Sequence, residues 1–164
     1  MTTTTADVYD EQGHALDSLT LQLQGCGGVA AFDGPIRTIQ CFRDNALVRR
    51  VLATPGDGSV LVIDGGGSLE SALVGDVIAA SAVAHGWGGL VINGAIRDRA
   101  IIGTLSIGVK ALGTNPVRSS KEGTGEIDLP VTFGGVRFMP GAHLWADGDG
   151  VLVERIAGER PTAA

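Results

Sequence analysis

The sequence predicts an α/β fold with a parallel strand–helix–strand unit at its centre and antiparallel strands in a second layer. Residues 60–63 and 89–92 are short apolar runs, typical of strands covered on both faces. Between them, Leu73, Val77, Ala80 and Ala84 recur at helical spacing. Such a unit has parallel strands and a right-handed crossover. After residue 126, short β-like segments alternate with Gly, Pro and Asp, which predicts antiparallel hairpins.

The N-terminal part predicts two strands. Residues 1–14 are polar and are expected to be flexible, apart from a helical turn over residues 6–11. The glycine-rich segment 25–33 predicts a strand that enters a tight turn at Asp33-Gly34-Pro35. Residues 36–42 then alternate apolar and polar side chains, which is the period of a half-buried strand.

The remaining elements follow from caps, breakers and short apolar runs. Asp44 is a suitable N-cap for a helix over residues 45–53. A turn or short helix is expected over residues 97–105, followed by a strand near residues 108–112. The C-terminal strands are expected at residues 127–131, 136–139, 143–146 and 151–155. The polar tail, residues 158–164, is expected to be flexible.

The composition argues against nucleic acid as a partner. The 164 residues, predicted to form one domain over residues 1–164, carry a net charge of −6. A nucleic-acid binder needs a basic face that neutralises phosphates. The basic pair Arg49-Arg50 lies on a predicted helix and is interpreted as solvated surface.

Other features predict a cytoplasmic protein without a membrane partner. No apolar run reaches transmembrane length, and the N-terminal residues lack the basic and apolar regions of a signal peptide. Cys26 and Cys41 lie apart with no CxxC spacing. They are therefore expected to be buried, reduced thiols and not metal ligands.

A glycine run follows the first buried strand, with the sequence Asp-Gly-Gly-Gly-Ser over residues 64–68. Glu70 stands where a dinucleotide fingerprint needs its third glycine, and its carboxylate would oppose a pyrophosphate. No Lys-Ser or Lys-Thr pair of a Walker loop follows either. The favoured interpretation is a tight strand-to-helix turn, whose N–H groups could still hold a small anion.

Arg97 and Asp98 follow the second buried strand and an expected turn over residues 93–96. Ligands of α/β sheets bind at this edge. Arg97 offers a planar fork for a carboxylate, and Asp98 a hard oxygen for Mg²⁺ or Mn²⁺. Asp76, on the crossover helix, could share a pocket with them and support metal-assisted acid–base chemistry. The alternatives left open are a surface ion pair and a solvated helix position.

Six segments in the right order resemble a known family, over roughly residues 27–153. The sequence is identified as a member of the RraA family, named for regulator of ribonuclease activity A, which also contains the class II 4-hydroxy-4-methyl-2-oxoglutarate aldolases. Members that keep a metal and pyruvate site have an Asp, twenty intervening residues and then Arg-Asp. Asp76 and Arg97-Asp98 meet this spacing, which favours the enzymatic branch. The segments are residues 41–45, 60–68, 72–76, 89–98, 111–116 and 133–136.

The resemblance implies a role for each residue of the site. Arg97 would clamp the keto-acid carboxylate, and Asp98 would hold a divalent metal cation, Mg²⁺ or Mn²⁺. Asp76 would handle protons through an ordered water. The implied activities are 4-hydroxy-4-methyl-2-oxoglutarate aldolase and oxaloacetate decarboxylase, which share a pyruvate enolate. Substrate would also contact backbone N–H groups of four residues: Gly75, Asp76, Val77 and Ile78.

The resemblance also implies a layered β/β/α, swivelling-domain-like fold and a homotrimer with sites near subunit interfaces. Pro140-Gly141-Ala142 stands where the family has Pro-Gly-Asp, and the sequence lacks the C-terminal extension of dedicated aldolases. Decarboxylation is therefore the activity expected first. The alternative is a non-enzymatic regulator that docks onto a ribonuclease and inhibits RNA processing, with acidic charge that would complement a basic partner surface.

Overall fold

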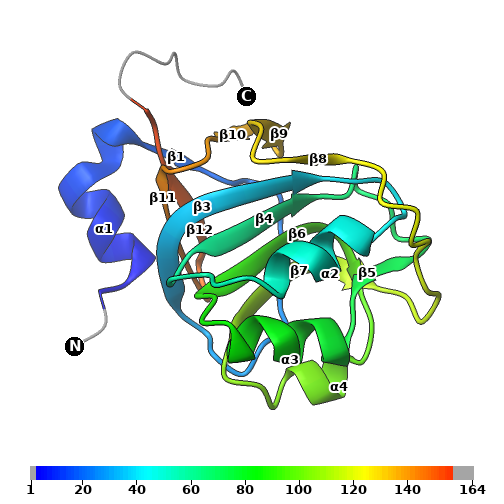
Figure 1. Cartoon of the computed structure of the whole chain (residues 1–164). Coiled ribbons are helices and arrows are strands. Elements are labelled where there is room, and N and C mark those ends of the chain that lie inside the picture. The colour runs from blue at the N-terminus through cyan, green and yellow to red at the C-terminus, as the bar shows by residue number, and fades with distance from the viewer. Residues whose placement is uncertain (1–2, 157–164) are drawn as a thin grey trace.

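One run of hydrogen-bonded strands forms the frame of the fold, in the order β1–β12–β11–β3–β4–β6–β7–β2. The computed structural model describes residues 3–156 (Figure 1). Strands β3, β4, β6 and β7 run parallel, and the strands at both ends of the run pair antiparallel. The strands are β1 (Leu16–Ser18), β2 (Gln24–Gly25), β3 (Phe32–Gln40), β4 (Val60–Asp64), β5 (Ala72–Val74), β6 (Gly89–Ile96), β7 (Gly108–Thr114), β8 (Glu126–Ile127), β9 (Val131–Phe133), β10 (Val136–Phe138), β11 (His143–Asp147) and β12 (Gly150–Glu154). The helices are α1 (Thr5–Gln12), η1 (Gly13–Ala15), α2 (Ala46–Leu52), α3 (Asp76–Ala84) and α4 (Arg99–Ile102).

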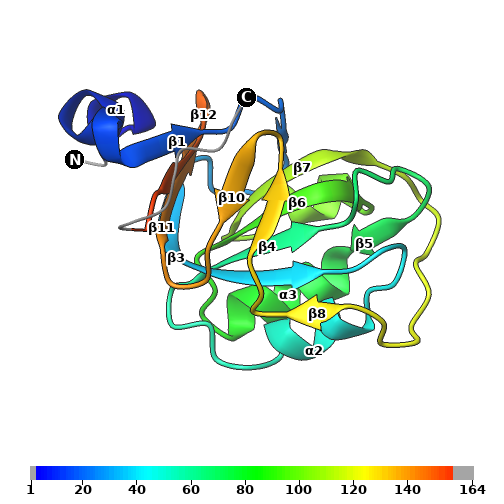
Figure 2. The ribbon, with the colours of Figure 1, turned by 90° about the horizontal axis from the view of Figure 1, so that it is seen from above.

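The parallel strands have different apolar neighbours on their two faces, which produces three layers. Leu61 and Ile63 of β4 pack in a core with α2 and α3. Val60 and Val62 face the other way and pack with the β9–β10 hairpin, which crosses over the strands in Figure 2. This alternation follows from the two-residue period of a strand. The α/β class, with a parallel centre, an antiparallel layer and β/β/α layering, is confirmed.

Strand β3 joins the antiparallel and parallel parts of the sheet. Its residues from Phe32 to Pro35 pair with β11, and those from Ile36 onward pair with β4. The tight turn predicted at Asp33-Gly34-Pro35 was therefore wrong, because these residues lie inside a strand. A Cβ on Gly34 would lie 2.2 Å from the Gly58 carbonyl oxygen, so only glycine fits there. Pro35, which has no N–H to donate, lies where the strand changes partner.

The segment between β4 and β6 contains a short strand that the sequence did not predict. Leu73 belongs to β5, which pairs with the end of β6, and helix α3 begins only at Asp76. The turn predicted over residues 93–96 was also wrong. Strand β6 continues to Ile96, across an irregularity in its pairing with β7. The late start of α3 and the longer β6 have the same cause: residues 72–74 form a strand, and this strand pairs with the end of β6.

Helix α1 forms where the sequence predicted a flexible segment with a helical turn. Thr4 and Asp7 form a capping box at its start. The N–H and the hydroxyl of Thr5 donate to the Asp147 carboxylate at 2.8 and 2.7 Å. These contacts attach the helix to the end of β11. The tail predicted to be flexible, residues 158–164, lies outside the described residues.

Cys26 and Cys41 are free and buried, as predicted. Burial raises the pKa of the Cys41 thiol to about 12, with further increases from Asp44 and Asp64. The thiol is therefore protonated and unreactive at neutral pH. No helix within residues 3–156 is both long enough and apolar enough to cross a membrane.

We expect Asp147→Asn to lower stability by about 1 kcal/mol near neutral pH and by progressively less below about pH 4. Burial alone would raise the pKa of Asp147, but hydrogen bonds from Thr5 and Asp149 outweigh burial and hold this pKa below its usual 3.8. The ionised carboxylate therefore stabilises the fold fully above that value, and its contribution is lost as the pH falls through the lower folded-state pKa. Melting curves of both proteins over this pH range check the prediction. A difference between them that is independent of pH would contradict it.

Candidate functional site

Arg97 and Asp98 follow the last residue of β6, at the carboxyl ends of the parallel strands. The Arg97 N–H donates to the Val74 carbonyl at 3.0 Å, which ties this segment to the end of β5. Asp98 has a left-handed backbone with φ 57° and leads into α4. Such a conformation costs a non-glycine residue about 1 kcal/mol and is tolerated best by Asn and Asp.

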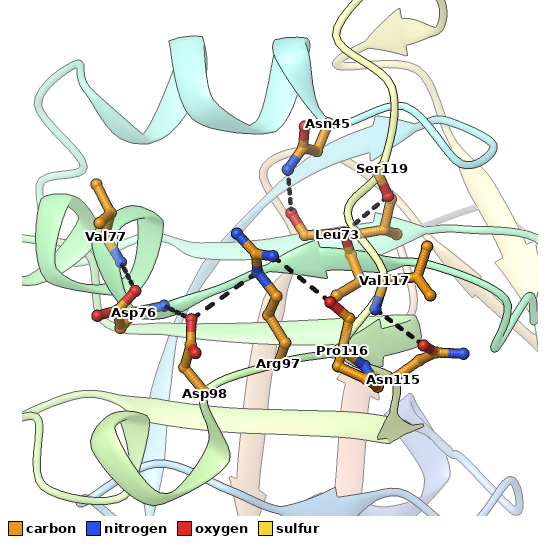
Figure 3. A network of polar contacts seen from close by, with 11 residues as sticks. Asn45, Leu73, Asp76, Val77, Arg97, Asp98, Asn115, Pro116, Val117 and Ser119 are labelled. Atoms are coloured by element: carbon orange, nitrogen blue, oxygen red, sulfur yellow. Dashed lines mark hydrogen bonds and ion pairs between the residues drawn. The ribbon is translucent and has the colours of Figure 1, made fainter.

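The Asp98 carboxylate reaches the start of α3, as Figure 3 shows. The Asp76 N–H donates to Asp98 Oδ2 at 3.2 Å, and Arg97 Nε lies 3.9 Å from the same oxygen. The Val77 N–H donates to Asp76 Oδ1 at 2.9 Å. Negative charge at the first turn of a helix is also favoured by the helix dipole. The structure thus brings together Asp76, Arg97 and Asp98, which twenty intervening residues separate in the chain.

Asp76 and Arg97 line a cavity of about 260 Å³, and Asp98 lies beside it. A cavity of this volume suits a ligand of few heavy atoms. The N–H groups of Asp76 and Val77 already donate to protein carboxylates, so a bound anion would compete for them. The other residues predicted to bind substrate line the same cavity: Gly75, Val77 and Ile78.

Three further cations line the cavity: Arg49 from α2, and Arg118 and Lys121 from the segment after β7. Within residues 3–156, none of their side chains has a hydrogen bond or an ion pair. Arg49, interpreted from the sequence as solvated surface, is exposed but faces a cavity that Arg97 also lines. The sequence analysis did not single out Arg118 and Lys121. Their closeness in the sequence, with two basic residues within four positions, was the signal that could have indicated an anion-binding segment. The cavity is therefore electropositive in a chain of net charge −6.

Hydrogen bonds hold the segment after β7 against β5 and Arg97. The Ala72 N–H donates to the Val117 carbonyl at 2.8 Å, and the Ser119 hydroxyl donates to the Ala72 carbonyl at 2.7 Å. Arg97 Nη1 makes a long contact of 3.5 Å with the Pro116 carbonyl (Figure 3). This segment positions one wall of the cavity and leaves most of the Arg97 fork available.

The glycine run is a turn between β4 and β5 and not a turn into a helix. The N–H groups of Gly65 and Gly67 donate to the Asn93 carbonyl, and that of Gly66 donates to Asp64 Oδ1. The strand-to-helix turn predicted here was wrong, because β5 precedes α3. These N–H groups have partners inside the protein, so they are not free to hold the small anion considered from the sequence.

Asp98 and Asp76 are the carboxylates that would hold a divalent cation at this cavity. No three His, Cys, Asp or Glu side chains form a ready ligand cluster in the described part of the chain. Mg²⁺ is commonly held by one or two carboxylates together with water and substrate oxygens, so this donor set fits Mg²⁺ or Mn²⁺. The Asp98 side chain is 35% exposed, which leaves it accessible to such an ion.

A family model described as RraA-like, Aldolase/RraA, matches residues 5–153. The chain belongs to the Aldolase/RraA family. The match covers the parallel strands, the antiparallel layer and the residues of the candidate site. It confirms the family resemblance seen in the sequence.

Two solved structures align with nearly the whole chain. An S-adenosylmethionine:2-dimethylmenaquinone methyltransferase from Geobacillus kaustophilus is 46% identical, with a TM-score of 0.91 over 96% of this chain and 99% of its own. The RNA-processing inhibitor RraA from Thermus thermophilus is 42% identical, with a TM-score of 0.91 over 99% of this chain and all of its own. RraAS2 of Streptomyces coelicolor is described as an unusual member of the RNase ES inhibitor RraA protein family. It is 27% identical, with a TM-score of 0.75 over 94% of this chain and 81% of its own.

Gly75, at the start of α3, lies directly against the side chains of Arg97 and Asp98. A Cβ there would lie 2.9 Å from Asp98 Oδ2 and 3.4 Å from two atoms of Arg97. We expect Gly75→Ala to displace the Asp98 carboxylate and shift the NMR resonance of the Asp76 amide proton, at a cost in stability of about 1 kcal/mol or less, because only two partly exposed side chains have to move. Gly25→Ala is the control, because a Cβ at Gly25 meets no atom within 4 Å. An Asp76 resonance that does not move would count against this geometry.

Proposed function

We propose that the protein is a divalent-metal-dependent lyase that cleaves C–C bonds of pyruvate-type α-keto acids. Its reactions would be retro-aldol cleavage of 4-hydroxy-4-methyl-2-oxoglutarate and decarboxylation of oxaloacetate, which share a pyruvate enolate. The observation that supports this proposal is the meeting of Asp76 and Arg97 in one cavity with Asp98 beside it. Membership of a family that includes aldolases supports the reaction class.

Arg97 is proposed to bind the carboxylate next to the ketone. A guanidinium forms two parallel hydrogen bonds with a carboxylate. In this chain its protein contacts are long, 3.5 Å to the Pro116 carbonyl and 3.9 Å to Asp98, so the fork can turn to a substrate. A carboxylate held there would bring the adjacent ketone near Asp98.

Asp98 is proposed to hold Mg²⁺ or Mn²⁺, whose charge would stabilise the negative charge that develops on the ketone oxygen. The Asp76 N–H contributes by orienting the Asp98 carboxylate at 3.2 Å. Removing the Asp98 charge should therefore affect turnover more than folding.

Asp76 is proposed to move protons. In the retro-aldol reaction the C4 hydroxyl loses a proton as the C3–C4 bond breaks, and in decarboxylation the same bond breaks with release of CO₂. In both reactions C3 of the enolate then takes up a proton. The Asp76 carboxylate lines the cavity, and an ordered water between it and the substrate would carry the proton.

Arg49, Arg118 and Lys121 are proposed to attract the second carboxylate, which both proposed substrates carry. A cation that has no protein partner loses no ion pair when it binds an anion, so its attraction for the substrate is not offset. These three cations have no such partner within residues 3–156. The cavity should therefore prefer keto diacids to keto monoacids.

We expect oxaloacetate decarboxylation that requires Mg²⁺ or Mn²⁺ and disappears in EDTA, after subtraction of the non-enzymatic metal-catalysed rate. Asp98→Asn keeps an acceptor for the Asp76 N–H and tolerates a left-handed backbone, but it removes the charge. Its turnover should fall on the order of 100-fold. Arg97→Lys keeps a charge but loses the planar fork, and its KM should rise on the order of tenfold.

The matched control for these variants is Arg50→Gln. It removes a cation from α2 next to Arg49, at a residue that does not line the cavity. Its rate should equal that of the wild type. Folded Asp98→Asn and Arg97→Lys proteins with wild-type rates would refute the lyase proposal.

The second candidate function is binding to a ribonuclease and inhibition of RNA processing. The RNA-processing inhibitor RraA of Thermus thermophilus, which is 42% identical, supports it. The net charge of −6 would suit a basic partner surface. A regulator of this kind needs no ligand cavity, whereas a lyase does, so the lyase stays the preferred function.

An RNA-cleavage assay separates the two functions. Under the lyase proposal, excess protein leaves the rate of a purified ribonuclease unchanged. Inhibition of cleavage without turnover of any keto acid would favour the regulator, and this inhibition should weaken with added salt because it depends on opposite charges.

A methyltransferase function, the name carried by the Geobacillus relative, has no support at the site. Such an enzyme must bind S-adenosylmethionine. The glycine run is the segment most similar to a nucleotide-binding loop, and its N–H groups donate to Asn93 and Asp64. We therefore propose no such activity for this chain.

A further inference from the structure

We propose that Asp44 is a positioning residue for the anion-binding wall of the cavity, although its side chain does not line the cavity itself. The wall consists of two segments: residues 45–49, which include Asn45 and Arg49, and residues 118–121, which include Arg118 and Lys121. This inference rests on the proposed function, because it assumes that the cavity binds an anionic keto acid.

Both carboxylate oxygens of Asp44 accept hydrogen bonds, and the donors come from both segments. The residue is 1% exposed. Its Oδ1 accepts from the Ala46 N–H at 3.1 Å, at the start of α2. Its Oδ2 accepts from the Ser120 hydroxyl at 2.9 Å and from the Glu122 N–H at 2.7 Å. The Gly123 N–H lies 3.2 Å from each oxygen. One carboxylate thus holds the first turn of α2 and the turn after Ser120 together.

Backbone hydrogen bonds beside Asp44 join the same two segments. The Asn45 N–H donates to the Ser120 carbonyl at 3.0 Å, and the Ser120 N–H donates to the Arg43 carbonyl at 2.8 Å. Arg43 has a left-handed backbone with φ 55°. Such a conformation persists only where the surrounding structure holds it. The Arg43 carbonyl accepts from Ser120, which also contacts Asp44, so Ser120 belongs to the structure that surrounds this residue.

The charge of Asp44 is satisfied without an ion pair to the cavity cations. Burial alone would raise the pKa of Asp44, but the hydrogen bonds from Ala46, Ser120, Glu122 and Gly123 outweigh burial and hold this pKa below its usual value. Within residues 3–156, the cations at 118 and 121 keep no ion pair of their own. Asp44 therefore places these cations without neutralising them.

Asp147 provides a matched control for a purely structural role. It also accepts hydrogen bonds from backbone N–H groups and a hydroxyl, and its pKa is also lowered. However, it holds α1 and does not contact the wall of the cavity. Substitution of either aspartate should lower stability, but only substitution of Asp44 should change affinity for an anion.

The test compares wild type, Asp44→Asn and Asp147→Asn in the presence of Mn²⁺. KM and kcat are measured with oxaloacetate, and the Kd for 2-oxoglutarate is measured by calorimetry. The asparagine of Asp44→Asn has one oxygen acceptor where Asp44 uses two, so the turn after Ser120 loses part of its support. We expect KM and Kd to rise about tenfold in Asp44→Asn with kcat within about twofold, and no change in Asp147→Asn.

Amide hydrogen exchange of residues 118–123 gives a readout that does not depend on activity, and it should become faster only in Asp44→Asn. If that variant does not fold, Ser120→Ala removes one donor and should raise KM and Kd about threefold. Values of KM and Kd equal to those of Asp147→Asn, or a fall in kcat alone, would overturn the positioning role and leave the lyase proposal standing. A wild type that neither turns over oxaloacetate nor binds 2-oxoglutarate would overturn both.

Discussion

The pairing of β5 with the end of β6 is the contact on which the candidate site depends. Strand β5 is short and fully buried, and it lies directly before α3. Through this pairing the Arg97 N–H reaches the Val74 carbonyl, and the Asp98 carboxylate can then meet the Asp76 N–H. Side chains held on packed elements keep their geometry better than side chains on free loops. The two halves of the site are therefore set by the sheet and not by loop closure.

Carboxylates outside the cavity hold loops, which explains how an acidic chain maintains an electropositive cavity. Asp44 closes the turn after Ser120, Asp64 closes the glycine run, and Asp147 holds α1. Each is satisfied by N–H or hydroxyl donors, which stabilise a buried charge without neutralising a cation. Arg118 and Lys121 consequently stay free of ion pairs in the part of the chain that the structure describes.

Relatives of this fold carry the names of an enzyme and of RNA-processing inhibitors, although their backbones superpose closely. A shared fold does not decide between such functions, because function depends on the residues grafted onto it. In this chain the residues that bear on the choice are Asp76, Arg97 and Asp98, together with three cations around the same cavity that have no ion pair within residues 3–156. They support the lyase proposal because a docking surface needs neither a ligand-sized cavity nor converging charges.

The sequence by itself determined the α/β class, most of the strands and helices, and the three residues at the centre of the candidate site. Apolar runs and alternation are local signals, and the spacing of Asp76 and Arg97-Asp98 matches a family pattern over a nearly chain-long resemblance. Strand β5 is too short to show a period, and Gly34-Pro35 looks like a turn until β11 and β4 supply partners. The cations at 49, 118 and 121 come from distant segments. Only the tertiary structure decided that these cations meet, because their meeting depends on strand pairing and on hydrogen bonds from Ser120 and Glu122 to Asp44, which is distant from them in the sequence.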